Sequence, residues 1–157
     1  MLGKTYEGQD CSAARTLELV GERWSLLIIR DALFAGMTRF SEFERSLGIA
    51  PNVLAARLAW FVEAGLMTIE PVSEDSELSE YRLTEKGTEL APVVVALTAW
   101  GERWVEPIGP IVYKHRECGG LVGQVITCAS CGEEVQPADV VVELRTPRRS
   151  RPSSRRH

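Results

Sequence analysis

Four side chains near the C-terminal end have the types and spacing of a metal site. They form two pairs with two residues between the members of each, His115 with Cys118 and Cys128 with Cys131. Zinc prefers four thiolate and imidazole ligands in a tetrahedron. A glycine follows each pair, as expected for a tight turn with a positive φ angle. The pattern predicts a structural Zn²⁺ site, a zinc-ribbon-like knuckle on a small β-hairpin with a strand-like segment at 121–127.

Two other interpretations of these cysteines stay open. Cys128 and Cys131 could be a redox pair, although such a pair normally opens a helix in a βαβ unit, which the surrounding sequence does not predict. The thiols could also hold no metal. A closed site with four protein ligands leaves no position for a substrate, so zinc would order a segment too short to form its own core.

Cys11 stands immediately before a predicted helix, where backbone N–H groups favour a thiolate. The nearby acids Glu7 and Asp10 oppose that effect. Cys11 is therefore either an ordinary half-buried thiol or a redox sensor. Sensing would need a bridge to the same cysteine of a second chain or an adduct with a small thiol.

The composition is ordinary for a globular protein, and the sequence contains no motif typical of an active site. The chain has 157 residues, 45% hydrophobic and 25% charged. Its only histidines are His115 and His157, and it has no glycine-rich phosphate loop, so we predict that it is not an enzyme. No apolar run approaches the roughly 18 residues of a membrane span, and the N-terminus lacks the apolar segment of a secretion signal. We therefore expect a cytoplasmic protein.

Charge is distributed unevenly along the chain, although the net charge is only −4. Residues 145–157 hold six arginines and no acid, so the rest of the chain has a net charge of −10. A basic tail on an acidic body suggests contact with a polyanion. The tail could equally be a disordered, solvated end, because its arginine, proline and serine content fits both interpretations.

The first part of the chain predicts four helices, at residues 12–20, 24–34, 39–47 and 51–64, because apolar residues recur with the helical period of 3.6. The second helix is apolar nearly all round, which is typical of the middle of a core. Proline at position 51 favours a helix start. The expected inner faces are Ala13, Leu17 and Val20 on the first helix and Leu54, Leu58, Phe61 and Val62 on the fourth.

Two strands, at residues 67–72 and 80–83, flank a polar loop and predict a β-hairpin. A long helix over 84–104 should follow, with a kink at Pro92. Its apolar stripe is Leu90, Val94, Leu97 and Trp104. The fold class is thus mainly α with a small hairpin, organised as a body at 1–106, a zinc-ribbon-like extension at 107–144 and a disordered basic tail at 145–157.

The third and fourth helices are joined by a tight turn, and a hairpin follows, which is the order of a winged helix-turn-helix. The second helix of such a pair enters the major groove with its N-terminal residues nearest the bases. Asparagine can bond adenine, and alanine methyls suit the thymine methyl, so we predict base contacts from Asn52, Ala55 and Ala56. Helix pairs of this kind also occur in proteins that never bind DNA. The predicted phosphate contacts are the helix N-terminus at Pro51 and the side chains of Arg39, Arg57 and Arg82.

Several short motifs together resemble the HxlR family of bacterial winged-helix regulators, which are relatives of MarR. They are GERWSLLIIRDAL at 21–33, RFSEF at 39–43, LAARL at 54–58 and YRLTEKG at 81–87. The resemblance spans about residues 11–104. It implies a homodimer on a palindromic operator of double-stranded DNA, with dimer contacts from the regions around 6–20 and 90–104. By their position alone, Trp100 and Trp104 could belong to that interface or to the core of one chain.

The loop at 73–80 departs from this family, whose wings usually carry prolines and basic residues. It holds four acids and no base. Acids repel phosphates, so we expect weak wing contacts, supplied by Arg82 alone or replaced by the arginine-rich tail. A second function stays open for an acidic body of this kind, because winged helices also serve as protein–protein interaction modules.

Overall fold

The computed structural model describes residues 5–9, 11–73, 78–105 and 109–143. The chain forms two units, residues 1–124 and 125–157. The arginine-rich tail and three acids of the hairpin loop, Glu74, Asp75 and Glu77, lie outside the described residues. The predicted domain boundaries and the role of the tail therefore stay predictions.

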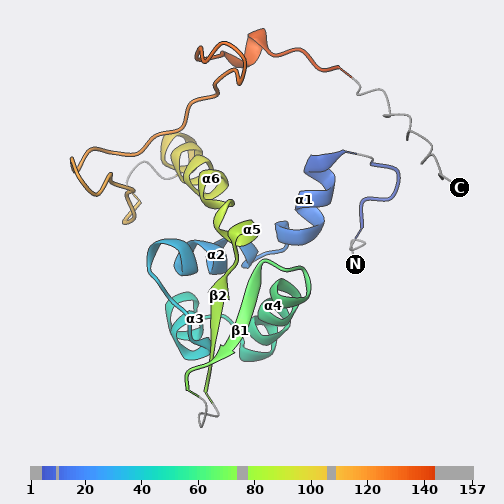
Figure 1. Cartoon of the computed structure of the whole chain (residues 1–157), viewed down its shortest axis with the longest axis vertical. Coiled ribbons are helices and arrows are strands. Elements are labelled where there is room, and N and C mark those ends of the chain that lie inside the picture. The colour runs from blue at the N-terminus through green and yellow to red at the C-terminus, as the bar shows by residue number, and fades with distance from the viewer. Residues whose placement is uncertain (1–4, 10, 74–77, 106–108, 144–157) are drawn as a thin grey trace, which may run out of the picture. The chain divides into compact units, whose positions relative to one another are not determined.

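The described part of the first unit is mainly helical, with a two-stranded antiparallel hairpin (Figure 1). None of the described helices is long and apolar enough to cross a membrane. The elements, in chain order, are α1 (Ser12–Val20), α2 (Ser25–Phe34), α3 (Phe40–Leu47), α4 (Pro51–Glu63), β1 (Met67–Pro71), β2 (Ser79–Leu83), α5 (Glu85–Thr88) and α6 (Ala91–Trp104).

The core of this unit is built around α2, α3 and α4. Ile28 and Ile29 of α2 and Phe43 of α3 are fully buried, as the apolar pattern predicted. The inner face of α4 joins them through Leu54, Leu58 and Phe61, all without solvent exposure. Burying such side chains stabilises the fold by roughly 1.5–3 kcal/mol each, so α4 is fixed by its leucine side.

The predicted inner face of α1 is confirmed at Val20 and wrong at Ala13 and Leu17. Ala14 and Val20 are buried, whereas Ala13 is exposed and Leu17 is 48% exposed. Ala13 and Leu17 are four residues apart and share a face of the helix. The apolar stripe of α1 is thus only partly used within one chain.

The predicted long helix over 84–104 is in fact two helices, α5 and α6, with a break at Glu89 and Leu90. Pro92 explains the break, because it lacks a backbone N–H and its ring collides with the carbonyl four residues earlier. Pro92 instead lies in the first turn of α6, where a missing N–H has no cost. The sequence correctly predicted that Pro92 disturbs the helix, but the result is a break between two helices and not a kink within one.

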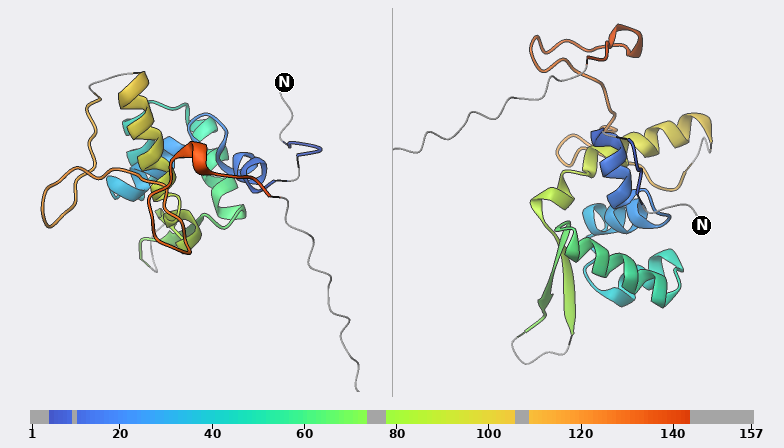
Figure 2. Two further views of the ribbon diagram at one scale, coloured as in Figure 1. Left: turned by 90° about the horizontal axis from the view of Figure 1, so that it is seen from above. Right: turned by 90° about the vertical axis from the view of Figure 1, so that its right-hand side faces the viewer.

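The hairpin lies beside the helices rather than over them (Figure 2). Met67 pairs with Leu83 at its base, and Pro71 pairs with Ser79 near its tip. The Tyr81 N–H donates to the Thr38 carbonyl at 2.7 Å, so β2 also bonds to the segment before α3. Gly87 follows β2 at the start of α5, where a Cβ would overlap the Leu66 carbonyl oxygen. These contacts hold the hairpin next to α3 and α4.

The strand-like segment predicted at 121–127 is not a strand. Only its ends pair, Leu121 with Lys114 and Thr127 with Glu134, each as an isolated bridge. The second unit has, in its described part, one short 3₁₀ helix at Pro137–Asp139 and no buried side chain. Without a packed face there is little to stabilise a longer strand pairing.

Candidate nucleic-acid interface

The turn between α3 and α4 presents the start of α4 to solvent. Gly48 has a φ of 59°, a left-handed conformation in which it ends α3 without the steric cost of a Cβ. Ile49 follows and is 3% exposed, so it anchors the turn in the core. Ala50 is extended, and Pro51 then opens α4. The N-terminal N–H groups of α4 therefore begin at the surface, where a phosphate could accept from them.

The outer face of α4, which we define as Pro51, Asn52, Ala55 and Ala56, is exposed. The opposite side of the helix is the buried leucine side, so the orientation predicted from the sequence is confirmed. Three of the four side chains are small and uncharged. A duplex could thus approach the helix backbone closely, with Asn52 as the group able to bond a base edge.

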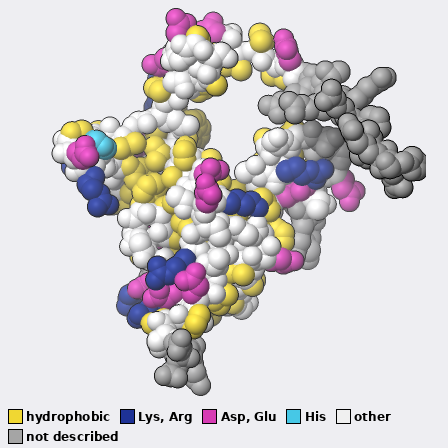
Figure 3. Space-filling view, viewed as in Figure 1, with side chains coloured by type: hydrophobic (Ala, Val, Ile, Leu, Met, Phe, Trp, Pro, Cys, Tyr) yellow, Lys and Arg dark blue, Asp and Glu magenta, His cyan; other side chains and the backbone are white. Residues whose placement is uncertain are grey.

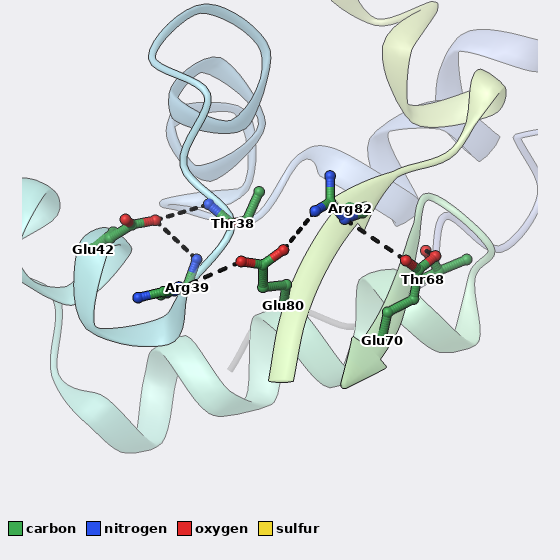
Figure 4. Close-up of polar contacts among 7 residues, drawn as sticks. All are labelled: Thr38, Arg39, Glu42, Thr68, Glu70, Glu80 and Arg82. Atoms are coloured by element: carbon green, nitrogen blue, oxygen red, sulfur yellow. Dashed lines mark hydrogen bonds and ion pairs between the residues drawn. The ribbon is translucent and has the colours of Figure 1, made fainter. Parts of the chain in front are cut away.

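Arginine side chains at the hairpin are held by acids of the same chain (Figure 4). One carboxylate oxygen of Glu80 forms an ion pair with the Arg82 guanidinium at 2.6 Å. The other oxygen lies 3.6 Å from the Arg39 Nε. The Arg82 Nε lies 3.6 Å from Glu70. We call these four side chains the hairpin ion-pair network. It holds two positive and two negative charges, so it has no net charge to offer a phosphate backbone.

Arg57 is the third predicted phosphate contact, and it too has an acidic partner. Its guanidinium lies 3.6 Å from Glu22, and its side chain is only 21% exposed. The sequence therefore located the arginines at this surface but not their partners. The acids missed are Glu22, Glu70 and Glu80; only Glu80 had a local signal, because it lies two residues from Arg82 on the same face of a strand.

The start of α3 is fixed by Glu42. Its carboxylate accepts the backbone N–H groups of Arg39 at 3.0 Å and Thr38 at 2.9 Å (Figure 4). These two hydrogen bonds lower the pKa of Glu42, and the one from Arg39 has the larger effect. Such an acid satisfies N–H groups at a helix start that have no partner within the helix. Glu42 thereby positions the backbone next to the hairpin ion-pair network.

The surface view shows the same mixture of charges. Basic and acidic side chains lie together near the hairpin, and hydrophobic side chains gather in the region of α6 (Figure 3). The face in view thus has no purely basic patch near the hairpin. The expectation of weak wing contacts stays a prediction.

The predicted metal ligands lie in two places along the chain. His115 and Cys118 belong to the first unit, with the His115 Nδ1 3.2 Å from the Cys118 Sγ. Cys128 and Cys131 belong to the second unit. Among the described residues, no three His, Cys, Asp or Glu side chains form a group that could hold a metal. The four-ligand site stays a prediction.

Cys11 is exposed and caps the start of α1, where its sulfur accepts the backbone N–H of Ala14 at 3.4 Å. Its thiol is therefore not the half-buried group of the simpler interpretation. It is accessible to reagents from solvent.

A helix-turn-helix with its second helix turned outward and a hairpin beside it matches a known family. Residues 19–109 match the model of the family described as HxlR-like helix-turn-helix. The chain belongs to the HxlR family. HxlR proteins and their relatives are transcriptional regulators, so this chain is a DNA-binding transcriptional regulator and not an enzyme.

Relatives and solved structures extend this similarity. Rv3095 of Mycobacterium tuberculosis, an uncharacterized HTH-type transcriptional regulator, is 44% identical over 144 residues, which are 90% of this chain and 89% of Rv3095. The crystal structure of PA1607, a candidate transcription factor, has a TM-score of 0.77 and 40% identity over 87% of this chain and 96% of PA1607. Both matches are too long to end at residue 109, so they include part of the C-terminal extension.

A redox regulator is among the solved structures that are similar to this chain. The structure of HypR in its reduced form covers 59% of this chain and 92% of HypR, with 29% identity and a TM-score of 0.54. HypR in its oxidized form matches with a TM-score of 0.53. These values support a common winged-helix fold for the helical part of the chain.

Proposed function

We propose that this HxlR-family regulator acts as a symmetric homodimer on a palindromic operator, with one α4 in the major groove of each half-site. The observation that carries the proposal is the outer face of α4. It is exposed, small and neutral, while the other side of the helix is fixed by buried leucines. A recognition helix needs both properties, because only a rigid helix that can approach closely distinguishes base edges.

The dimer part of the proposal rests on an apolar stripe along α6. Val94 and Val95 face the core of the chain, but another row of apolar side chains on α6 points to solvent. Its two tryptophans, Trp100 and Trp104, are 59% and 66% exposed. The full stripe is Val93, Leu97, Trp100 and Trp104, with spacings of four, three and four residues.

That spacing is typical of a helix that packs against a partner helix. Exposed aromatic residues in such numbers mark an interface more often than an ordinary surface. Leu17 on α1 adds a further exposed apolar side chain. Both helices lie on the side of the first unit away from the hairpin tip (Figure 1), so a dimer formed there would leave both copies of α4 free.

The recognition role is tested by Ala56→Glu, which adds a bulky acid to an exposed position. We expect binding to the operator to fall by at least about 100-fold, since a clash and a phosphate repulsion both oppose docking. Ala35→Glu, the same change at an exposed position just after α2, should leave binding within about threefold. Footprinting on DNA next to its own gene would provide the operator.

Two results would contradict the proposal. One is an Ala56→Glu protein that is folded and binds the operator like the wild type. The other is a wild-type protein that fails to bind duplex DNA in dilute salt, where phosphate contacts are strongest. The second result would instead favour a protein–protein interaction module.

The dimer interface is tested by Trp100→Glu, which places a charge in the middle of the α6 stripe. We expect a monomer in sedimentation experiments and loss of operator binding, because a palindrome is contacted by two copies at once. Val105→Glu is a control just past the end of α6, at a position that is also exposed. A dimer that survives Trp100→Glu would show that the interface lies elsewhere.

We further propose that Cys11 makes the regulator redox-responsive. The support is its exposed thiol at a helix start and the likeness to HypR, whose structure exists in reduced and oxidized forms. A bridge between Cys11 of two copies would remove two protons and two electrons, which an added diazene oxidant such as diamide accepts. We expect diamide to change the operator footprint of the wild type and not that of Cys11→Ser. An equal response of both proteins would assign the effect to the other cysteines.

A further inference from the structure

Two turns in the C-terminal part of the chain have the same backbone geometry, 13 residues apart. The first turn covers residues 115–120 and the second turn residues 128–133. In each, the first residue donates its N–H to the sixth residue, His115 to Gly120 at 2.8 Å and Cys128 to Glu133 at 2.9 Å. The fifth residue is a glycine that donates back to the first carbonyl, at 2.8 Å in both turns.

The match continues on both sides of the turns. The residues just outside each turn form an isolated antiparallel bridge, Lys114 with Leu121 and Thr127 with Glu134. One step further out, the Val122 N–H donates to Tyr113 and the Val135 N–H to Ile126, both at 2.8 Å. Gly119 and Gly132 have φ angles of 70° and 76°, a conformation that residues with a side chain rarely adopt. The same structural unit is therefore built twice from different sequences.

Besides the glycine at the fifth position, the two turns share a possible metal ligand at the first and at the fourth position. In the first turn these ligand atoms are already close, with the His115 Nδ1 3.2 Å from the Cys118 Sγ. For a tetrahedral zinc with Zn–N near 2.0 Å and Zn–S near 2.3 Å, the two ligand atoms lie about 3.5 Å apart. The first turn thus holds its two ligands at nearly the separation that zinc requires.

The second turn prepares its sulfur in another way. The backbone N–H groups of Cys131 and Ser130 hydrogen-bond to the sulfur of Cys128. The thiolate is the form that binds a metal. N–H groups directed at the first sulfur are what a turn must supply when it carries a metal thiolate.

The described part of the segment that carries the second turn has no hydrophobic core. None of the described side chains from 125 to 143 is buried, and the apolar residues Val125, Ile126, Val141 and Val142 are exposed. Short segments without a core usually need a metal or a disulfide to fold. Hydrogen bonds within one turn do not compensate the entropy of ordering such a segment.

We propose that each chain binds one Zn²⁺ through the Nδ1 of His115 and the sulfurs of Cys118, Cys128 and Cys131. Each turn supplies two ligands, and a structural zinc site takes four. Binding releases the protons of the three thiols and changes no oxidation state. The metal closes the C-terminal extension into one folded segment.

The test is metal analysis of the full-length protein, loaded with zinc and freed of excess metal by gel filtration. We expect about one zinc per chain in the wild type and less than about 0.2 in Cys118→Ser and in Cys128→Ser. Cys11→Ser is the matched control and should keep the full amount, because Cys11 belongs to neither turn. Circular dichroism of the helices checks that the variants remain folded, since α1 to α6 all lie outside the two turns.

Cobalt provides a second measurement on the same proteins. Co²⁺ in place of zinc should give the visible absorption of a tetrahedral thiolate site in the wild type and in Cys11→Ser, and His115→Ala should change it. The proposal is wrong if the wild type binds no zinc, if Cys118→Ser and Cys128→Ser both retain it, or if iron is bound instead. One zinc per two chains would also overturn it, because the site would then join different chains.

Discussion

The outer face of α4 and the hairpin are neighbouring parts of the candidate interface, but they offer a duplex different things. The α4 face is small and neutral, with one asparagine able to bond a base. The hairpin carries charges that cancel within the ion-pair network. Base contacts give specificity, and phosphate contacts give affinity and salt dependence. The difference fits the proposal that α4 distinguishes base edges, whereas the described charges of the hairpin cancel and leave little to attract a phosphate backbone.

The strand register explains why the hairpin charges cancel. Glu70 lies directly opposite Glu80, and Thr68 lies opposite Arg82. Two carboxylates opposite each other are destabilising in a hairpin, so a cation between them is needed for the hairpin itself. Arg82 has that position, and Arg39 adds a second cation from the start of α3. The arginines expected to contact DNA therefore act first within the protein.

The largest expected effect separates the two regions by their role in folding. Leu58→Ala empties a fully buried position on α4 and should lower the free energy of unfolding by about 2–5 kcal/mol. Ile69→Ala on β1 removes a side chain that is 49% exposed and should cost less than about 1 kcal/mol. Urea denaturation measures both. Equal losses would mean that the hairpin is as much a part of the core as α4.

The next effect concerns the proposed contact between Asn52 of α4 and a base of the operator. Asn52→Ala removes the only hydrogen-bonding side chain of the outer face and should lower the affinity for the operator by about 1–3 kcal/mol, roughly 5- to 150-fold. Affinity for unrelated duplex DNA should stay the same, because Asn52 carries no charge. Fluorescence anisotropy with both duplexes checks this. An equal loss on both duplexes would place Asn52 at a phosphate instead of a base.

Much of this comparison could be predicted from the sequence. The inner residues Leu54, Leu58 and Phe61 follow from the helical period alone, and their burial fixes which side of α4 is outward. Pro51 and Gly48 mark the helix start and the preceding turn. These signals are local, so a single sequence carries them.

The remainder depends on contacts between distant segments. Glu22 meets Arg57 across 35 positions, and Glu80 meets Arg39 across 41; no local pattern predicts either pair. The inner face of α1 was misjudged because Leu17 fits a core position by period but is 48% exposed in the structure. The break before α6 was underestimated because a kink and a break at proline look the same in sequence.

A smaller effect tests the charge balance of the hairpin directly. Glu80→Gln frees Arg39 and leaves Arg82 with Glu70 as its acidic partner, so we expect operator affinity to rise by about three- to tenfold at low salt. The gain should shrink with added salt, with a steeper salt slope by about 0.9 for each new phosphate contact. Glu63→Gln changes the net charge equally at the far end of α4 and is the control. Identical gains in affinity in both variants would mean that the change in net charge, and not the release of an arginine, causes the gain.

The smallest effect is the most specific to the network. Arg82→Gln in the wild type should change the salt slope by less than about 0.3, because its guanidinium is held by Glu80 and Glu70 and releases no counterion from DNA. In the Glu70→Gln/Glu80→Gln background the same substitution should lower the slope by about 0.9, since Arg82 is then free to meet a phosphate. Titrations over a range of salt concentrations give all four slopes of this double-mutant cycle. If Arg82→Gln lowers the slope equally in both backgrounds, Arg82 already contacts DNA in the wild type, and the hairpin binds the backbone despite its acids.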